Sequence, residues 1–207
     1  MSERGAIKKG SFVKWIANIL IIAGAATLLL LISGVHSNKK QQSERLNAFA
    51  AMKAEAANSS DIHPALPNGT LDPKLEGIEG ILDIPQIDLE APVLLGADEQ
   101  TLSEGLGAIE NMDQPGVIDG SYAIAGHQSH VFGKYFNRLH EMEAGQEFTY
   151  ETLDGIQRYK VFDIQIVKPE QVEILDSQNG IALLSLITCY PERSNEYRLI
   201  VQAKRIQ

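Results

Sequence analysis

The chain has 207 residues, a net charge of −9 and a single cysteine. This acidic balance argues against nucleic-acid binding, which needs a basic face to meet phosphates. One cysteine excludes an internal disulfide framework, so a hydrophobic core must stabilise the fold, and about 130 residues are enough for one.

The first element in chain order is the apolar segment Trp15–Val35. As a helix, its twenty-one residues rise about 31 Å, which is enough to cross a bilayer. Basic residues are slightly more numerous before it than after it, which favours a cytoplasmic N-terminus. We therefore predict a cytoplasmic basic tail over residues 1–14 and a transmembrane signal-anchor over residues 15–35, with the remainder outside the membrane. A cleaved signal peptide is the alternative, but its apolar core would be shorter and no clear A-x-A site follows this one.

The net charge also differs between the N-terminal part of the chain and the remainder. Residues 1–60 carry a balance of +5, and residues 61–207 carry −14. The second value indicates a strongly acidic exported domain, most of whose carboxylates lie on a solvated surface.

Residues 36–75 are predicted to be an extracytoplasmic linker, rich in Ala, Asn, Ser, Lys and Gln and then in Pro and Gly. A helix is expected within it over Ser43–Ala57. The stretch Leu66–Thr70, Leu-Pro-Asn-Gly-Thr, leads to two hypotheses. Residues 61–73 are either a plain spacer or a segment that folds back over the site of Cys189.

From residue 76 to residue 207 the sequence consists of short apolar runs separated by turn residues. This spacing predicts a mainly β domain, built as a closed or nearly closed antiparallel-rich barrel with two short helices. The helices are expected at Glu99–Leu106 and Gly133–Met142. The strands are expected at Gly80–Ile84, Ala91–Leu95, Ser121–Ala125, Glu147–Thr152, Arg158–Ile166, Ile181–Cys189 and Tyr197–Ala203.

Cys189 ends the apolar run that begins at Leu183, and a polar loop with Pro191 follows. A thiol at the end of a strand faces the rim of a domain, where side chains meet substrates. An inert, packed cysteine is the other interpretation, because free Cys often behaves as a small hydrophobe. A reactive thiol needs a partner, since a thiol of pKa near 8.5 is only about 3% ionised at pH 7.

His127 and Arg198 are the candidate partners. His127 follows the strand Ser121–Ala125, after a glycine that lets the backbone turn. Arg198 lies in the last strand, which a short loop joins to the strand of Cys189, so its guanidinium could supply donors for an oxyanion. An unemployed loop histidine and an outward-facing arginine are the plainer interpretations. Arg193 is the rival arginine, and His130 the rival histidine.

These residues carry a resemblance. Leu186-Ile187-Thr188-Cys189 resembles the end of the TLxTC signature of sortases, the membrane-anchored cysteine transpeptidases of Gram-positive bacteria. Ala125-Gly126-His127 is similar to the family's histidine motif, and Arg198 matches the position of the family arginine. The family usually has threonine where this chain has Ser185. The stretch Gly126–Leu139 looks most like class D sortases, with class A the close alternative.

The resemblance implies a closed eight-stranded sortase-type β-barrel with two or three short helices. It also implies a reaction in which Cys189 attacks the threonine carbonyl of an LPxT-type sorting signal on a secreted protein. A thioester forms, His127 acts as general acid and base, and Arg198 stabilises the oxyanion or the substrate. A cell-wall precursor amine then accepts the acyl group. Thr188 is expected to border the substrate.

Two other classes of function remain open at this point. One is a secreted cysteine hydrolase that uses water as acceptor, and the other is a catalytically idle barrel that binds wall peptides. No cofactor is expected. Some class A relatives bind calcium, but no ligand spacing in this chain compels a site.

Overall fold

The computed structural model describes residues 14–15, 17–24, 27, 43–54, 77–128, 135–192 and 194–207. Residues 1–13 of the expected basic tail, the segment Leu66–Thr70 and the rival residues His130 and Arg193 lie outside these ranges. The chain separates into two units, residues 1–43 and 44–207. In the first, residues 17–24 are helical. Among the described residues, no helix combines the length and apolarity needed to cross a bilayer.

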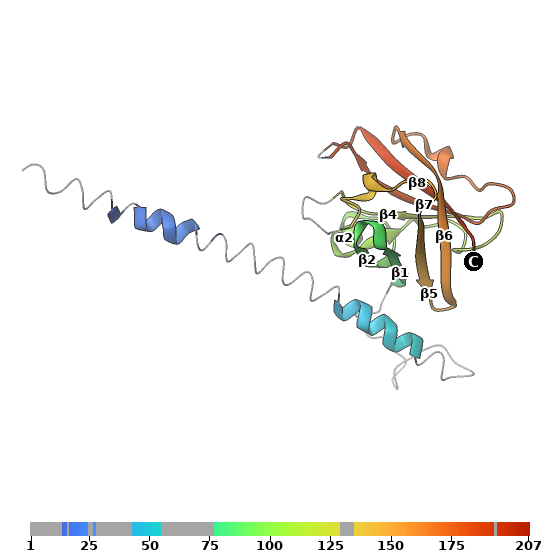
Figure 1. The fold of residues 1–207 in the computed structure, drawn as a ribbon, viewed down its shortest axis with the longest axis horizontal. Coiled ribbons are helices and arrows are strands. Elements are labelled where there is room, and N and C mark those ends of the chain that lie inside the picture. Colours follow the sequence, from blue (N-terminus) through green and yellow to red (C-terminus); the bar gives the residue numbers. More distant parts are fainter. Residues whose placement is uncertain are drawn as a thin grey trace, which may run out of the picture. The chain divides into compact units, whose positions relative to one another are not determined.

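The second unit contains a closed barrel, which in the described part of the chain has eight strands (Figure 1). Their order around the barrel is β1-β2-β3-β4-β7-β8-β6-β5. Two neighbouring pairs are parallel, β2 with β3 and β4 with β7, and the other pairs are antiparallel. The closed eight-stranded barrel is thus confirmed. The strands are β1 (Ile78–Ile84), β2 (Leu89–Leu95), β3 (Leu106–Ala108), β4 (Ser121–Ala125), β5 (Glu147–Thr152), β6 (Gly155–Val167), β7 (Leu183–Tyr190) and β8 (Tyr197–Arg205).

Short helices lie in the connections between the strands of the barrel. Helix α2 (Glu99–Glu104) begins at Asp98, whose carboxylate accepts a hydrogen bond from the Thr101 amide at 2.9 Å. The helix ends before Gly105, so the predicted extension to Leu106 is wrong, and Leu106 instead opens β3. The remaining turns are the 3-10 helices η1 (Pro85–Ile87), η2 (Leu139–Glu141) and η3 (Val172–Leu175).

The helix predicted over Gly133–Met142 is wrong for the residues described there. Tyr135 has a φ of +52° and forms an antiparallel bridge with Gln128. Helical geometry is confined to the three residues of η2. The spacing of Tyr135, Phe136 and Leu139 suggests a helical face, but these side chains are apolar because they pack against the barrel core. Phe136 and Leu139 belong to the core, and Tyr135 packs against it.

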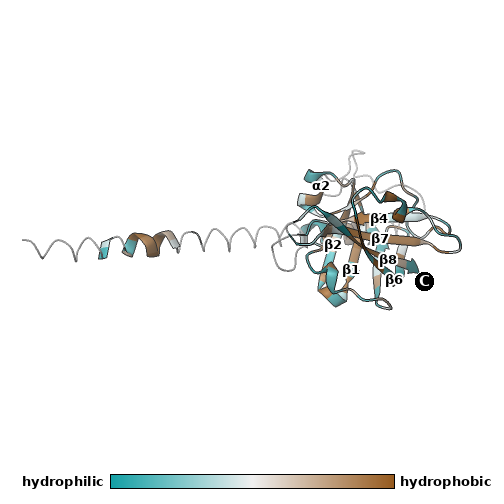
Figure 2. Ribbon diagram, turned by 90° about the horizontal axis from the view of Figure 1, so that it is seen from above, coloured by the Kyte–Doolittle hydropathy of each residue, from teal (hydrophilic) through white to brown (hydrophobic). Residues whose placement is uncertain are grey.

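The core consists of buried hydrophobic residues contributed by the barrel strands, and Figure 2 shows hydrophobic residues along these strands. Its largest fully buried side chains are aromatic. The rings of Phe148 and Tyr159 stack with their centroids 5.8 Å apart, and the Tyr122 and Tyr150 hydroxyls lie 3.1 Å apart. Burial of each such side chain stabilises the fold by roughly 1.5–3 kcal/mol.

Residues 43–54 form a helix, named the N-terminal helix below, as predicted for most of Ser43–Ala57. Phe49 and Met52 are buried against Ile78, Ile81 and Leu94 on strands β1 and β2, and this group forms a second hydrophobic cluster. Two ion pairs flank the cluster, Arg45 with Glu104 of α2 and Lys53 with Glu151 of β5. The helix is thus attached to the barrel by an apolar face and by a charge at each end.

Candidate active site

Cys189 and Arg198 face each other across two adjacent strands. β7 and β8 are antiparallel, and their register pairs Cys189 with Arg198. Alternate residues of a strand point to opposite faces. Leu184 and Leu186 of β7 belong to the interior core, so Cys189 and Arg198 lie on the outward face. Both side chains are partly exposed. The neighbourhood expected from the short β7–β8 loop is therefore seen.

His127 reaches the same level from the other side of β7. Strands β4 and β7 are parallel, and their register pairs Ala125 with Ile187. The Gly126 amide continues this pairing by donating to the Ile187 carbonyl at 3.0 Å. His127 lies two residues beyond the end of β4, and continuing the register by two residues would set it opposite Cys189. The side chain of His127 is exposed.

Arg198 is held by the loop that precedes it. Its Nη1 donates to the carbonyl of Asn195 at 3.1 Å and to that of Tyr197 at 3.0 Å. Within the described residues, these are the hydrogen bonds that the guanidinium makes. Its other N–H groups can therefore donate to a negatively charged oxygen placed between β7 and β8.

Thr188 has a different contact from the one expected for it. Its side chain is buried, and its Oγ1 donates to the carbonyl of Gly126 at 2.8 Å. The hydroxyl thus fastens the residue before Cys189 to the residue before His127. A role for Thr188 toward substrate remains a prediction.

On the outward face, the next two cross-strand pairs of β7 and β8 after Cys189 and Arg198 are Ile187 with Ile200 and Ser185 with Gln202. Helix η3 is anchored over this end of the face. Ser121 Oγ donates to the Leu175 carbonyl at 2.6 Å, and Gln202 Nε2 donates to the Ile174 carbonyl at 2.7 Å. Sequence reasoning missed both anchors because neither residue belongs to a motif, although each occupies an outward position of an apolar strand.

A thiol, an imidazole and a guanidinium at one end of three adjacent strands can perform acyl transfer. The thiolate attacks a carbonyl carbon, the imidazole moves protons, and the guanidinium stabilises the oxyanion. Among the described residues, no group of three or more His, Cys, Asp and Glu side chains is arranged to hold a metal ion. The fold and the site together define a cysteine acyltransferase on a closed β-barrel.

Comparisons with known proteins agree. The sequence pattern of the sortase domain matches residues 82–206. Sortase D of Bacillus subtilis (strain 168) is 28% identical over 195 residues, covering 92% of this chain and 95% of that protein. Sortase A of Bacillus anthracis is 27% identical over 194 residues, covering 85% and 90%.

Solved structures of sortases share the fold. Sortase C-1 from Actinomyces oris superposes with a TM-score of 0.61 at 27% identity, covering 78% of this chain and 99% of that one. For sortase C of Streptococcus pneumoniae the TM-score is 0.62 at 29% identity, with coverage of 80% and 89%.

The matched domain spans more than half of the chain, so this chain belongs to the sortase family. The family expected from the three motifs is thus confirmed. Sortases are cysteine transpeptidases, which cleave sorting signals and transfer the released acyl group to cell-wall amines.

Proposed function

We propose that this chain is a membrane-anchored sortase, most similar to class D, that cleaves LPxT-type sorting signals after threonine. The observation that carries the proposal is the register of three adjacent strands. The β7–β8 register pairs Cys189 with Arg198, and extending the β4–β7 register by two residues beyond Ala125 supports a position of His127 next to Cys189. The similarity to Sortase D of Bacillus subtilis supports the subclass.

In the first half-reaction the Cys189 thiolate attacks the threonine carbonyl carbon, and the carbonyl oxygen becomes an oxyanion. Arg198 donates to this oxygen or to the substrate backbone. The tetrahedral intermediate collapses when the C–N bond breaks, and the His127 imidazolium protonates the leaving amine. The product is a thioester between Cys189 and the threonine carbonyl.

In the second half-reaction a cell-wall precursor amine attacks the thioester carbonyl. Neutral His127 takes a proton from that amine, the C–S bond breaks, and the Cys189 thiolate is restored. Atoms and charges balance over the two steps, so the side chains alone carry the chemistry of this scheme and no cofactor is included.

The proposed location follows from the sequence. Residues 15–35 would form the membrane anchor, the N-terminus would be cytoplasmic, and residues 76–207 would form the extracytoplasmic catalytic domain. Carbonate extraction of membranes and protease protection test this placement. Release of the intact chain by carbonate would contradict an anchor.

The reaction is tested with the full chain in detergent, a panel of LPxTx peptides and a triglycine acceptor, followed by mass spectrometry. The expected product carries triglycine joined to the threonine carbonyl, and Cys189→Ala yields none. Formation of the free acid alone, at any acceptor concentration, would indicate the hydrolase instead. Peptide binding without any reaction, unchanged in Cys189→Ala, would indicate the idle binder.

A further inference from the structure

His127 depends on its neighbours in the chain for its position. Its imidazole is exposed, and within the described residues it makes no side-chain hydrogen bond. The residue before it is fixed: Gly126 bonds to β7 through its amide and its carbonyl. A side chain that must move protons in two steps therefore relies on the backbone around it.

The other side of this backbone is held by Tyr135 and Phe136. A Cβ atom added at Gly126 would lie 2.6 Å from the Phe136 ring, so the fully buried ring packs directly against the Gly126 backbone. Beyond His127, Gln128 forms an antiparallel bridge with Tyr135. The residues on both sides of His127 thus contact consecutive residues of one segment.

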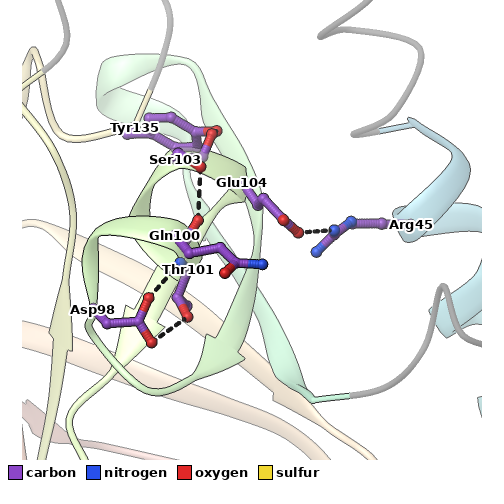
Figure 3. Close-up of polar contacts among 7 residues, drawn as sticks. All are labelled: Arg45, Asp98, Gln100, Thr101, Ser103, Glu104 and Tyr135. Atoms are coloured by element: carbon purple, nitrogen blue, oxygen red, sulfur yellow. Dashed lines mark hydrogen bonds and ion pairs between the residues drawn. The ribbon is translucent and has the colours of Figure 1, made fainter.

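Tyr135 is in turn held by helix α2. Its hydroxyl donates to the Ser103 carbonyl at 3.0 Å, and burial raises the pKa of this phenol. The next residue of α2, Glu104, forms an ion pair with Arg45 of the N-terminal helix (Figure 3). A continuous series of contacts therefore runs from Arg45 through α2 to the segment beside His127.

We propose that Tyr135 is a positioning residue for His127, and that the Arg45–Glu104 ion pair joins the N-terminal helix to this support. The inference rests on the proposed function, because it takes His127 as the acid and base. Misplacement of a reacting group by 1 Å can cost about a hundredfold in rate. Loss of the hydrogen bond from the Tyr135 hydroxyl should displace His127 by less than this, so we expect a smaller loss of rate.

The first test is Tyr135→Phe in the full chain, which removes the hydroxyl and leaves the ring. We expect kcat to fall about tenfold while KM for the sorting peptide stays within twofold. The alkylation rate of Cys189 by iodoacetamide and the thermal midpoint should be unchanged, because the change keeps the ring of Tyr135 and leaves the strand pairing of Cys189 untouched. A kcat within twofold of wild type, or a loss confined to KM, would overturn the proposal.

The ion pair is tested by charge exchange. Arg45→Glu and Glu104→Arg should each lower kcat about threefold, and the double exchange should restore most of the loss. Lys53→Glu is the matched control, because Lys53 joins the same helix to β5 rather than to α2, and its kcat should stay near wild type. Failure of the double exchange to recover activity, or an equal loss in Lys53→Glu, would refute the role of the ion pair.

His127→Ala separates this inference from the function on which it rests. If His127→Ala keeps full transpeptidation, the proposed acid–base assignment fails. If His127→Ala is inactive while Tyr135→Phe and the exchange variants behave as wild type, only the positioning inference fails.

Discussion

At the scale of single residues, Arg198 combines two kinds of contact. One guanidinium nitrogen donates to the carbonyls of Asn195 and Tyr197, and the strand register pairs the residue with Cys189. The planar guanidinium has several N–H donors, so it can bond to these carbonyls and to an oxyanion near Cys189 at the same time. The ammonium group of lysine cannot reproduce that geometry.

We therefore expect Arg198→Lys to lower kcat roughly 10²–10³-fold, the loss typical of one missing oxyanion donor. The measurement is steady-state transpeptidation with a sorting peptide and triglycine. Arg193→Ala is the control for the choice of arginine. Near-normal turnover of Arg198→Lys together with an inactive Arg193→Ala would show that the other arginine does this work.

Ser185 presents the opposite case, a polar group with no visible partner. Its side chain is fully buried, and its Oγ makes no hydrogen bond within the described residues. Removing an unsatisfied buried hydroxyl relieves a desolvation cost, whereas removing a bonded one leaves its partner unpaired.

Ser185→Ala should accordingly leave the free energy of unfolding unchanged to within about 1 kcal/mol, or raise it. Ser121→Ala, which breaks the 2.6 Å bond to the Leu175 carbonyl, should lower it by about 1–3 kcal/mol. Urea denaturation of both variants gives the comparison. A larger loss for Ser185→Ala than for Ser121→Ala would mean that the Ser185 hydroxyl is bonded in solution.

The three candidate catalytic residues could be named from the sequence because each stands next to a local signal. Cys189 ends an apolar run, His127 follows a strand and a glycine, and Arg198 lies just past a short loop. The supports of these residues could not be named in this way. Thr188, Tyr135 and Phe136 act through contacts with residues far away in the sequence, and no spacing along the chain encodes such contacts.

At the scale of elements, the segment after β4 is built around the close contact of Gly126 with Phe136. The space beside Gly126 is filled by side chains from two other places in the chain. An added Cβ would lie 2.6 Å from the Phe136 ring and 2.7 Å from Leu106 Cδ2, and both side chains are fully buried.

Gly126→Ala should therefore cost about 1–3 kcal/mol of stability through overpacking, and it should also reduce turnover because His127 is the next residue. Thermal denaturation and peptide kinetics measure the two effects. Adding Phe136→Leu makes room beside the new methyl group, so the double variant should be more stable than the sum of the single changes predicts. Simple additivity would contradict the contact.

The elements that sequence patterns missed are short or determined by distant residues. β3 has three residues, and one of them is Gly107. Three residues are too few to show an alternating pattern. The predicted helix Glu99–Leu106 took in only the first residue of β3, Leu106, although the helix ends before Gly105. β4 and β5 were predicted with their observed bounds, because turn residues flank clear apolar runs. Tyr135 was assigned to a helix because its apolar neighbours have helical spacing, while its bridge to Gln128 is non-local.

At the scale of the whole molecule, buried tyrosines make stability depend on alkaline pH. Burial raises the pKa of Tyr122 to about 12 and also raises the pKa values of Tyr150 and Tyr159. In the unfolded chain these phenols ionise near pH 10. Their contribution to stability is therefore fully present below pH 10 and is lost as the pH rises through the folded pKa values.

We expect the free energy of unfolding to fall above pH 10, by up to about 1.4 kcal/mol per pH unit for each such tyrosine. Tyr122→Phe should make this fall less steep, even though it also costs stability at pH 7 through the lost contact with the Tyr150 hydroxyl. Urea denaturation at pH 8 to 11 measures the slope. Equal slopes for the two proteins would show that Tyr122 ionises alike in both states.

The barrel order has a consequence for the time at which the thiol becomes competent. β7 and β8 lie between β4 and β6, so the last hairpin of the chain enters a gap between strands that were synthesised earlier. Cys189 and Arg198 belong to this hairpin, and His127 lies 62 positions before Cys189 in the sequence. A growing chain that has not reached residue 189 therefore contains His127 without Cys189 or Arg198. Cys189 and Arg198 can come beside His127 only after β8 has been synthesised, so the proposed chemistry depends on the entry of this hairpin into the barrel.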